Sequence, residues 1–459
     1  MTCLKNVDSM SEISTTKKED IEGFITDWMT ETKVPGLSIG IVKDQNIIYS
    51  DGFGSKDLKN NSPATAETMY GIGSCTKSFT ALAILQMVEK NKLDLNDHIQ
   101  DHLPIKWEKN ISVHHLLTHS SSMPSLGIAE ALIDRLIEMD ERGVPMGDWG
   151  DFYIHLNQAE KEMTNKLGED FFYFNSGYDL LGLLIEEING VKYAKYVQEN
   201  ILNPLEMDRS TFKYETNDNF MKPYFIREEG PESTPYPDGE IGYASGGLIS
   251  NVLELCNYLK MNMDEGVFNG KKIIDKELLR KAHTGFIESR IGEYGYGWAV
   301  NDFLGEELIG HGGSIGVASG YIGFMDDLGV AILSNTSPSF SMEEIGKAIL
   351  AIMRGKEALK LPFFARKEKM DMLTGEYRSY KGIKRAEIEI DCGLLKLTFK
   401  ERLEENSLIL IPSSKHLKDH EFYYLDGRGN KNTVKFDVKS ENEIDLYIDR
   451  WRLHKNRSF

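Results

Sequence analysis

Two different hydrophobic periods follow one another along this chain. In residues 17–32, apolar side chains recur every three or four positions, which predicts an amphipathic helix. Residues 36–42 and 46–49 are short runs of β-forming residues around three polar positions, and they predict a hairpin. Residues 1–16 are polar and are expected to form a flexible tail.

The middle of the chain has mostly helical spacing, roughly over residues 74–217. The clearest predicted helices are residues 76–90, 176–188 and 192–200. Strands are predicted again at residues 296–300, 320–325 and 329–334, and a helix follows at residues 341–353. Because strands flank a helical middle, the sequence predicts one sheet assembled from distant segments, with a helical insertion beside it.

After residue 370, apolar and polar positions alternate with a period of two. The alternation is clearest in residues 388–399, 434–438 and 444–448, and Gly, Asn and Asp separate the runs. Residues 355–369 contain seven charged residues and one proline, so they are interpreted as a linker. The sequence thus predicts a domain over residues 17–354 and an antiparallel domain over residues 370–459, closed as a barrel or stacked as a sandwich.

Composition and charge exclude several classes of protein. The chain has 459 residues, 41% hydrophobic and 27% charged, with a net charge of −19. This charge argues against binding to nucleic acid or to an anionic membrane. No uncharged apolar run approaches the ~18 residues of a membrane helix, and the first residues lack the apolar core of a signal peptide. We therefore expect a cytoplasmic protein with free thiols, and we expect no metal and no cofactor.

The most informative chemical signal is Ser74 followed by Lys77 at the start of an apolar helix. At this spacing the two side chains lie on one helix face, and the helix N-terminus favours negative charge developing at Ser74. Burial would favour the neutral form of Lys77, which can take the proton of the serine hydroxyl. The motif is weak by itself, and the competing interpretation is a capping serine with an exposed lysine.

Two further segments carry polar groups suited to the same chemistry. Tyr173 and Asn175 stand just before a predicted helix, where a tyrosine hydroxyl can relay a proton and an asparagine amide can hold a substrate carbonyl. Residues 308–314 form a predicted strand that contains His311 and two glycines, and glycines there allow a substrate backbone to approach closely.

Together and in this order, these segments resemble the serine β-lactamase and penicillin-binding-protein-like superfamily, in its class C-like branch. The resemblance covers residues 21–353 and implies an α/β (α+β) β-lactamase-like transpeptidase fold with an antiparallel sheet and a helical insertion. A close resemblance within the superfamily is to an archaeal compartment-forming serine protease with a lipocalin-like C-terminal barrel. It implies a homo-oligomer held together through residues 370–459.

The resemblance also implies a role for each motif residue. Ser74 would be the nucleophile, Lys77 its base, Tyr173 the proton relay and Asn175 a substrate ligand. The backbone N–H groups of Ser74 and Ser314 would form the oxyanion hole. The third motif, usually Lys-Thr-Gly, falls on His311, Gly312 and Gly313. Because that lysine and threonine engage the antibiotic carboxylate in β-lactam-binding members, their replacement argues against strong β-lactamase activity.

The sequence predicts a serine hydrolase that forms an acyl-enzyme at Ser74, and specifically a peptidase for small peptides, including those with D-residues. A carboxylesterase using the same residues is an alternative, and so is a catalytically idle peptide-binding or scaffold member. Two roles stay open for His311. Proton transfer requires hydrogen-bond reach of Ser74 or Lys77 and makes activity fall as the pH drops through the histidine pKa. A positioning role orients the substrate instead.

Overall fold

The computed structural model describes residues 13–139, 146–164, 166–217, 219–338, 341–400, 405–414, 417, 419–440 and 443–455. Internal contacts divide the chain into two compact units, Met1–Gly355 and Lys356–Phe459. Residues 1–12 of the predicted tail lie outside the described residues. In the part of the chain that is described, no helix is long and apolar enough to cross a membrane.

The first unit contains a nine-stranded antiparallel sheet with the strand order β10-β11-β12-β13-β14-β15-β1-β2-β3. These strands are β1 Gly36–Lys43, β2 Asn46–Asp57, β3 Ser62–Pro63, β10 Ile287–Ser289, β11 Gly292–Tyr294, β12 Ala299–Phe303, β13 Glu306–Ser314, β14 Ser319–Phe324 and β15 Leu328–Ser334. Short two-stranded pairs lie outside this sheet: β4 Tyr70–Gly71 with β7 Ile249–Ser250, β5 Tyr224–Arg227 with β6 Gly230–Ser233, and β8 Val267–Phe268 with β9 Lys271–Lys272. Because β1 pairs with β15, the prediction of one sheet built from distant segments is confirmed.

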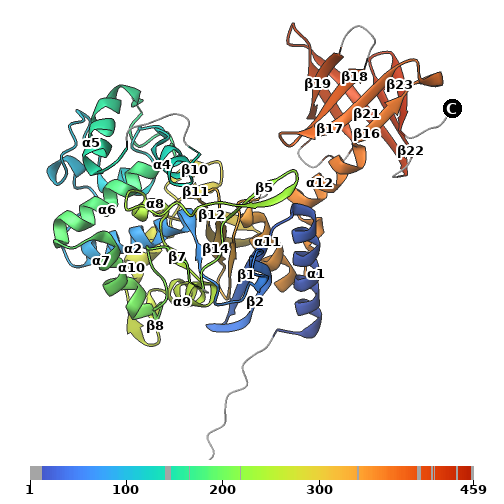
Figure 1. Cartoon of the computed structure of the whole chain (residues 1–459). Helices are drawn as coiled ribbons and strands as arrows, with labels where there is room; N and C mark the ends of the chain where they lie inside the picture. The colour runs from blue at the N-terminus through green and yellow to red at the C-terminus, as the bar shows by residue number, and fades with distance from the viewer. Residues whose placement is uncertain are drawn as a thin grey trace, which may run out of the picture. The chain divides into compact units, whose positions relative to one another are not determined.

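Helices cover both faces of the sheet (Figure 1). The helices of this unit are α1 Thr15–Thr32, α2 Thr76–Glu89, α3 Val113–Leu117, α4 Ile128–Leu136, α5 Trp149–Gln158, α6 Asn175–Asn189, α7 Tyr193–Val197, α8 Tyr243–Gly246, α9 Val252–Met263, α10 Lys276–Ala282 and α11 Met342–Met353, and those that contact the strands of the sheet most are α9 and α11. Helices α1 and α11 pack together on one side, whereas α9 crosses β1 and β15. Helix α1 begins two residues before its predicted start, because the Ser14 hydroxyl accepts a hydrogen bond from the Lys17 amide and caps it.

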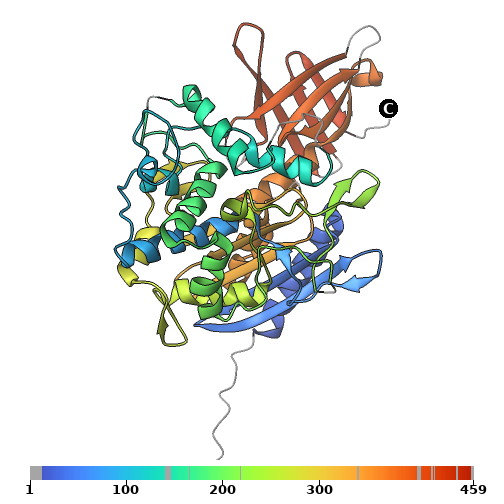
Figure 2. The ribbon, with the colours of Figure 1, turned by 60° about the vertical axis from the view of Figure 1, so that its left-hand side comes forward.

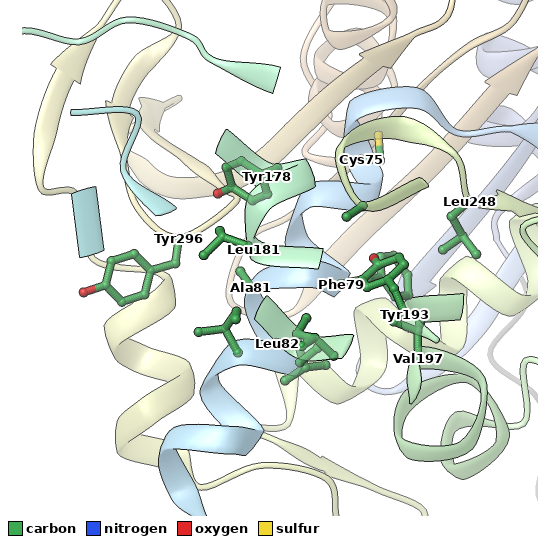
Figure 3. Packing of buried hydrophobic residues seen from close by; sticks show 14 of the residues in the cluster. Cys75, Phe79, Ala81, Leu82, Tyr178, Leu181, Tyr193, Val197, Leu248 and Tyr296 are labelled. Carbon is green, nitrogen blue, oxygen red and sulfur yellow. The ribbon is translucent and has the colours of Figure 1, made fainter. Parts of the chain in front are cut away.

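Helix α2 runs through the interior of the helical insertion. Residues 76–87 are all buried, so the helix has no solvent face. Figure 3 shows Phe79 and Leu82 of α2 packed among Tyr178 and Leu181 of α6 and Tyr193 of α7. The hydroxyl groups of α2 are hydrogen-bonded: Thr76 Oγ1 donates to the Gly73 carbonyl over 2.7 Å, and Thr80 Oγ1 lies 2.6 Å from the Ala244 carbonyl oxygen. A lysine side chain on such a helix is therefore buried, whichever face of the helix it lies on.

The second unit is a closed antiparallel barrel of eight strands, drawn in orange and red in Figures 1 and 2. Each strand pairs with the next, and the last pairs with the first: β16 Gly375–Arg378, β17 Arg385–Asp391, β18 Leu394–Lys400, β19 Glu405–Pro412, β20 Glu421–Leu425, β21 Lys431–Ser440, β22 Glu443–Ile448 and β23 Trp451–Lys455. This is the up-and-down topology of lipocalin-like barrels. Of the two antiparallel architectures that the sequence allowed, the barrel is therefore confirmed.

The structure differs from the sequence prediction in the segment interpreted as a linker. Residues 362–369 of this segment form the first part of a helix, α12 Pro362–Leu373. Pro362 occupies the first helical turn, where its missing N–H costs nothing. Met370 and Leu373 are buried with the barrel core, and they anchor the end of the helix. The charged residues that indicated a linker are mostly on the rest of this helix surface.

Candidate active site

Ser74 lies in a short 3-10 turn, Gly73–Cys75, that leads directly into α2. In residues 68–87 it is the one residue that is not buried. The α-helix itself begins at Thr76, the first residue of the helix predicted over residues 76–90, so Ser74 precedes it by two residues. The spacing still holds, because Lys77 Nζ lies 3.0 Å from Ser74 Oγ. The turn thus presents a hydroxyl from an otherwise buried segment.

The amino group of Lys77 is fully buried and is surrounded by three oxygen atoms. It donates to Ser74 Oγ over 3.0 Å, to Asn175 Oδ1 over 2.7 Å and to the Ser245 carbonyl over 2.7 Å. Burial lowers the pKa of Lys77 to about 7, and the nearby Asp179 carboxylate opposes this by favouring the charged form. Lys77 is therefore not the exposed lysine of the competing interpretation.

The identity of the three acceptors matters once Lys77 loses a proton. A neutral amine has two hydrogens to donate and one lone pair that needs a donor. The side-chain carbonyl of Asn175 and the backbone carbonyl of Ser245 can only accept. Among these three contacts, the Ser74 hydroxyl is the one group that can donate to the lone pair. Neutral Lys77 is thereby poised to receive the Ser74 proton.

Tyr173 and Asn175 come from an extended segment and the first residue of α6. Phe174 between them is buried and has an extended backbone at the helix N-cap, so the side chains on either side of it reach the site. Lys77 Nζ lies 4.7 Å from the centroid of the Tyr173 ring. Burial raises the pKa of Tyr173, and a hydrogen bond to Ser74 partly offsets this effect. Ser74 therefore interacts with both the amine of Lys77 and the hydroxyl of Tyr173.

His311 lies on β13, and it is buried with both ring nitrogens hydrogen-bonded. Nδ1 lies 2.6 Å from the Gly312 carbonyl and Nε2 lies 3.0 Å from the Tyr294 hydroxyl. Since a carbonyl can only accept, Nδ1 carries the proton and Nε2 accepts from Tyr294. Burial, with a smaller contribution from Lys77, lowers the pKa of His311 to about 3. The ring is thus neutral at the pH where an unperturbed histidine would titrate.

Gly73 and Gly313 allow two backbone segments to touch. A Cβ on Gly73 would lie 2.5 Å from Ser314 N, and this glycine has a left-handed backbone with φ of 54°. A Cβ on Gly313 would lie 2.0 Å from the Ile72 carbonyl oxygen and 2.8 Å from Ser74 N. Both contacts are too short for any side chain. The close approach brings the amides of Ser74 and Ser314, the predicted oxyanion donors, to the same place.

Replacing Gly313 by alanine should lower the acylation rate by about 10² to 10³, the cost of losing one oxyanion donor. The added methyl group would have to push β13 away from the Ile72 carbonyl and so separate the two amides. The measurement is the rate of Ser74 labelling by a fluorophosphonate. Gly312→Ala is the matched control, because its methyl group would meet nothing nearer than 3.9 Å and should cost far less. Equal losses in the two variants would contradict this account.

Two cavities meet at Ser74 and Ser314. One is bordered by Asn175, Asp179 and Asp238. Its remaining walls are largely apolar and include Leu132, Ile133, Leu136, Phe212 and Ile315. The other is bordered by Tyr173, His311, Arg290 and Glu343. Arg290 is exposed and pairs with no carboxylate among the described residues. The hydroxyl of Ser74 thus stands between a largely apolar recess and one that carries a cation and a carboxylate.

The structure brings all the predicted site residues together around these cavities, but it also adds groups that the sequence analysis missed. Ser245 contributes a backbone carbonyl, which no side-chain motif can reveal. Asp179 is a buried acid in an apolar helix, four positions after Asn175. An acidic residue among the apolar positions of a predicted helix was the signal in the sequence that could have identified Asp179. Tyr294 on β11 contacts His311 on β13. The two residues lie on separate strands, so no motif within one segment of the sequence connects them.

Comparison with known proteins supports the resemblance seen in the motifs. Residues 21–353 match the Beta-lactamase family, and residues 358–454 match the Pab87 octamerisation domain. Protein flp of Staphylococcus aureus (strain MRSA252) is 30% identical over 352 residues, which cover 72% of this chain and 64% of flp. The chain thus spans less than two thirds of the length of this relative.

Solved structures extend the comparison to both units. The octameric penicillin-binding protein homologue from Pyrococcus abyssi matches with a TM-score of 0.89 and 38% identity, covering 96% of this chain and 100% of that one. A class C beta-lactamase matches with a TM-score of 0.63 and 18% identity, covering 76% and 98% of the two chains, which is a likeness of fold. The first unit therefore has a β-lactamase-like fold.

Proposed function

Because the chain belongs to the Beta-lactamase family, whose members are serine hydrolases and acyl transferases, we propose that it is a serine peptidase acting on small peptides, including peptides with D-residues. Ser74 is the nucleophile, Lys77 the base and Tyr173 the group that returns the proton. The observation that carries this proposal is the hydrogen bonding of Lys77, whose lone pair can be filled by Ser74 alone among its three contacts.

In the proposed reaction, neutral Lys77 takes the Ser74 proton as Oγ attacks the substrate carbonyl carbon. The backbone amides of Ser74 and Ser314 stabilise the oxyanion, and Asn175 holds a substrate amide. Tyr173 gives its proton to the leaving nitrogen as the carbon–nitrogen bond breaks, and it is reprotonated from Lys77. Water then enters and reverses these proton transfers to release the acid. His311 acts as a positioning residue, since its hydrogen bonds hold Tyr294 and the Gly312 carbonyl in place.

The two cavities support a peptide rather than an ester as the substrate. Because Tyr173 protonates the leaving nitrogen, the leaving group occupies the cavity that Tyr173 borders, and the acyl group occupies the apolar cavity. Arg290 stands in the leaving-group cavity, where its guanidinium suits a carboxylate. A peptide with a free C-terminus supplies a carboxylate there, whereas a simple alcohol leaving group does not.

A substrate screen of the purified protein tests this proposal. The panel contains aminoacyl-D and aminoacyl-L peptides with free and with amidated C-termini, short-chain esters, and nitrocefin. We expect turnover of free-acid peptides with at least about tenfold higher kcat/KM than of their amides, and Arg290→Ala should remove that preference. Turnover of esters alone would establish the carboxylesterase alternative. No turnover together with no fluorophosphonate labelling would leave the peptide-binding scaffold instead.

We further propose that the chain forms a homo-oligomer through the barrel. This unit matches an octamerisation domain, and the Pyrococcus abyssi homologue is octameric. The barrel also exposes large apolar side chains: Tyr380, Ile383, Ile390, Ile409, Leu425 and Tyr447. Ile383 is 78% exposed, and an interface between barrels would remove such side chains from water.

Ending the chain at Gly355 should give a folded, catalytically competent monomer. This boundary is preferred to residue 369 because α12 packs with the barrel core. Multi-angle light scattering would give the mass of the truncated and full-length proteins, and kcat/KM would be compared for a dipeptide and for a folded protein substrate. We expect the full-length chain to exclude the large substrate. A truncated chain that keeps the oligomeric mass and the size limit would contradict the assembly role.

A further inference from the structure

His119 is a buried residue beside Tyr173 that lies outside the three motifs and takes no part in the proposed reaction. It follows α3 in a loop and is 1% exposed, with a left-handed backbone at φ of 57°. Its carbonyl accepts a hydrogen bond from the Phe172 amide over 2.9 Å. Its Nδ1 accepts one from the Phe174 amide over 3.0 Å. His119 therefore binds the backbone on both sides of Tyr173.

The imidazole also packs on the ring that it flanks. The centroids of the His119 and Tyr173 rings lie 4.3 Å apart, with 35° between the planes. The His119 ring also packs on Tyr294, and the centroids of these two rings lie 4.9 Å apart. Two backbone hydrogen bonds and one ring contact thus restrain the position and the orientation of Tyr173. Tyr294, which binds His311, packs against the same imidazole.

The hydrogen bonds also fix the protonation of His119. Nδ1 accepts from a backbone amide, so it carries a lone pair and the proton is on Nε2. Nε2 is buried and has no hydrogen-bond partner among the described residues. Burial, followed by the charge of Lys77 and by His311, lowers the pKa of His119 well below its usual value. The ring is thus neutral, and its Nδ1 acts as a hydrogen-bond acceptor.

Two features of His119 are unfavourable for simple packing. A buried N–H without an acceptor destabilises a fold, and so does a left-handed backbone on a residue with a side chain. An apolar side chain would fill the same aromatic surroundings without the first of these costs. What an apolar side chain lacks is an acceptor for the Phe174 amide. The acceptor is therefore the property of histidine that this position uses.

We propose that His119 is a positioning residue for Tyr173: by accepting from the amides of Phe172 and Phe174, it sets the tyrosine hydroxyl where it meets Ser74 and the leaving atom. This inference rests on the proposed function, in which Tyr173 protonates the leaving nitrogen. It predicts that disturbing His119 impairs reactions whose leaving group needs a proton. Reactions whose leaving group departs as a stable anion should be affected little.

The test compares an amide with a p-nitrophenyl ester of the same acyl group. His119→Phe keeps a ring but removes the Nδ1 acceptor, and it should lower kcat for the amide by about tenfold or more with little change in KM. Turnover of the ester should fall by less than about twofold. His119→Asn should restore most of the amide activity, because its side-chain oxygen can accept from the same amide and asparagine tolerates a left-handed backbone.

A double-mutant cycle completes the test. In a Tyr173→Phe background, His119→Phe should cause no further loss of amide turnover, because the hydroxyl that it positions is gone. Equal losses for amide and ester, or the same loss with and without Tyr173, would overturn the proposal and leave His119 as a packing residue. A wild-type protein that neither turns over any probe nor is labelled at Ser74 would contradict the proposed function itself. The two failures are therefore distinguishable.

Discussion

Replacing Ser74 by alanine should lower turnover on the order of 10⁶-fold, to the limit of detection, and should abolish labelling by a fluorophosphonate. The reason is geometric, because no other hydroxyl contacts both the Lys77 amine and the Tyr173 hydroxyl among the described residues. Mass spectrometry of the labelled protein should find one modified peptide, the one that contains Ser74. Thermal unfolding would check that the variant is folded.

Ser78→Ala is the matched control for this experiment. Ser78 lies on α2 four residues after Ser74, is buried, and donates to the carbonyl of Cys75 in the preceding turn. Removal of the Ser78 hydroxyl should leave the fluorophosphonate labelling of Ser74 unchanged. Labelling that survives Ser74→Ala with unchanged activity would place the nucleophile elsewhere and remove the basis of the proposed reaction.

Replacing Lys77 by methionine should lower kcat by about 10² to 10⁴, the usual contribution of a general base. Methionine keeps the length of the side chain and removes the amine. In the proposed reaction, the neutral form of Lys77 is the active one, so activity of the wild type should fall as the pH drops through the Lys77 pKa of about 7. The pH profile of kcat/KM for the free enzyme measures this limb, and it should be absent in Lys77→Met.

Two variants test whether the fall of kcat/KM at low pH reflects the titration of Lys77 or of a histidine. The Asp179 carboxylate favours the charged form of Lys77, so Asp179→Asn should lower the lysine pKa and move the limb to lower pH. His311→Gln should leave the limb where it is, because the pKa of His311 is already lowered to about 3. A limb that disappears in His311→Gln would restore the proton-transfer role of that histidine.

Local spacing accounts for the parts of the fold and site that the sequence predicted well. The stripe of α1, the hairpin of β1 and β2 and the alternation in the barrel each reflect contacts between residues close in sequence. Ser74 and Lys77 are also close, and three residues of helix fix their separation. The apolar surroundings of α2 were visible in its composition, so the burial of Lys77 followed without any knowledge of its partners.

The parts of the fold and of the site that the sequence did not predict depend on contacts between distant segments. The strand predicted at residues 296–300 begins only at Ala299, because the preceding turn packs its backbone against α2. Gly297 there has φ of 76°, and a Cβ would lie 2.7 Å from the Lys77 carbonyl oxygen. The hydrogen bonds of His311 could not be predicted for a similar reason, since Tyr294 approaches it from a separate strand. No pattern within either segment encodes such contacts.

The pairing of β1 with β15 has a consequence for how the protein is made. Leu37 pairs with Ser334, so the hairpin of β1 and β2 is synthesised early, while its other neighbour in the sheet is among the last strands of the first unit. At about 5 to 20 residues per second, this interval lasts roughly 15 to 60 s on the ribosome. Throughout it, the nascent chain presents an unpaired and strongly apolar strand edge, which is a template for pairing with other chains. Ribosome-associated chaperones should therefore determine how much of the synthesised chain reaches the native sheet.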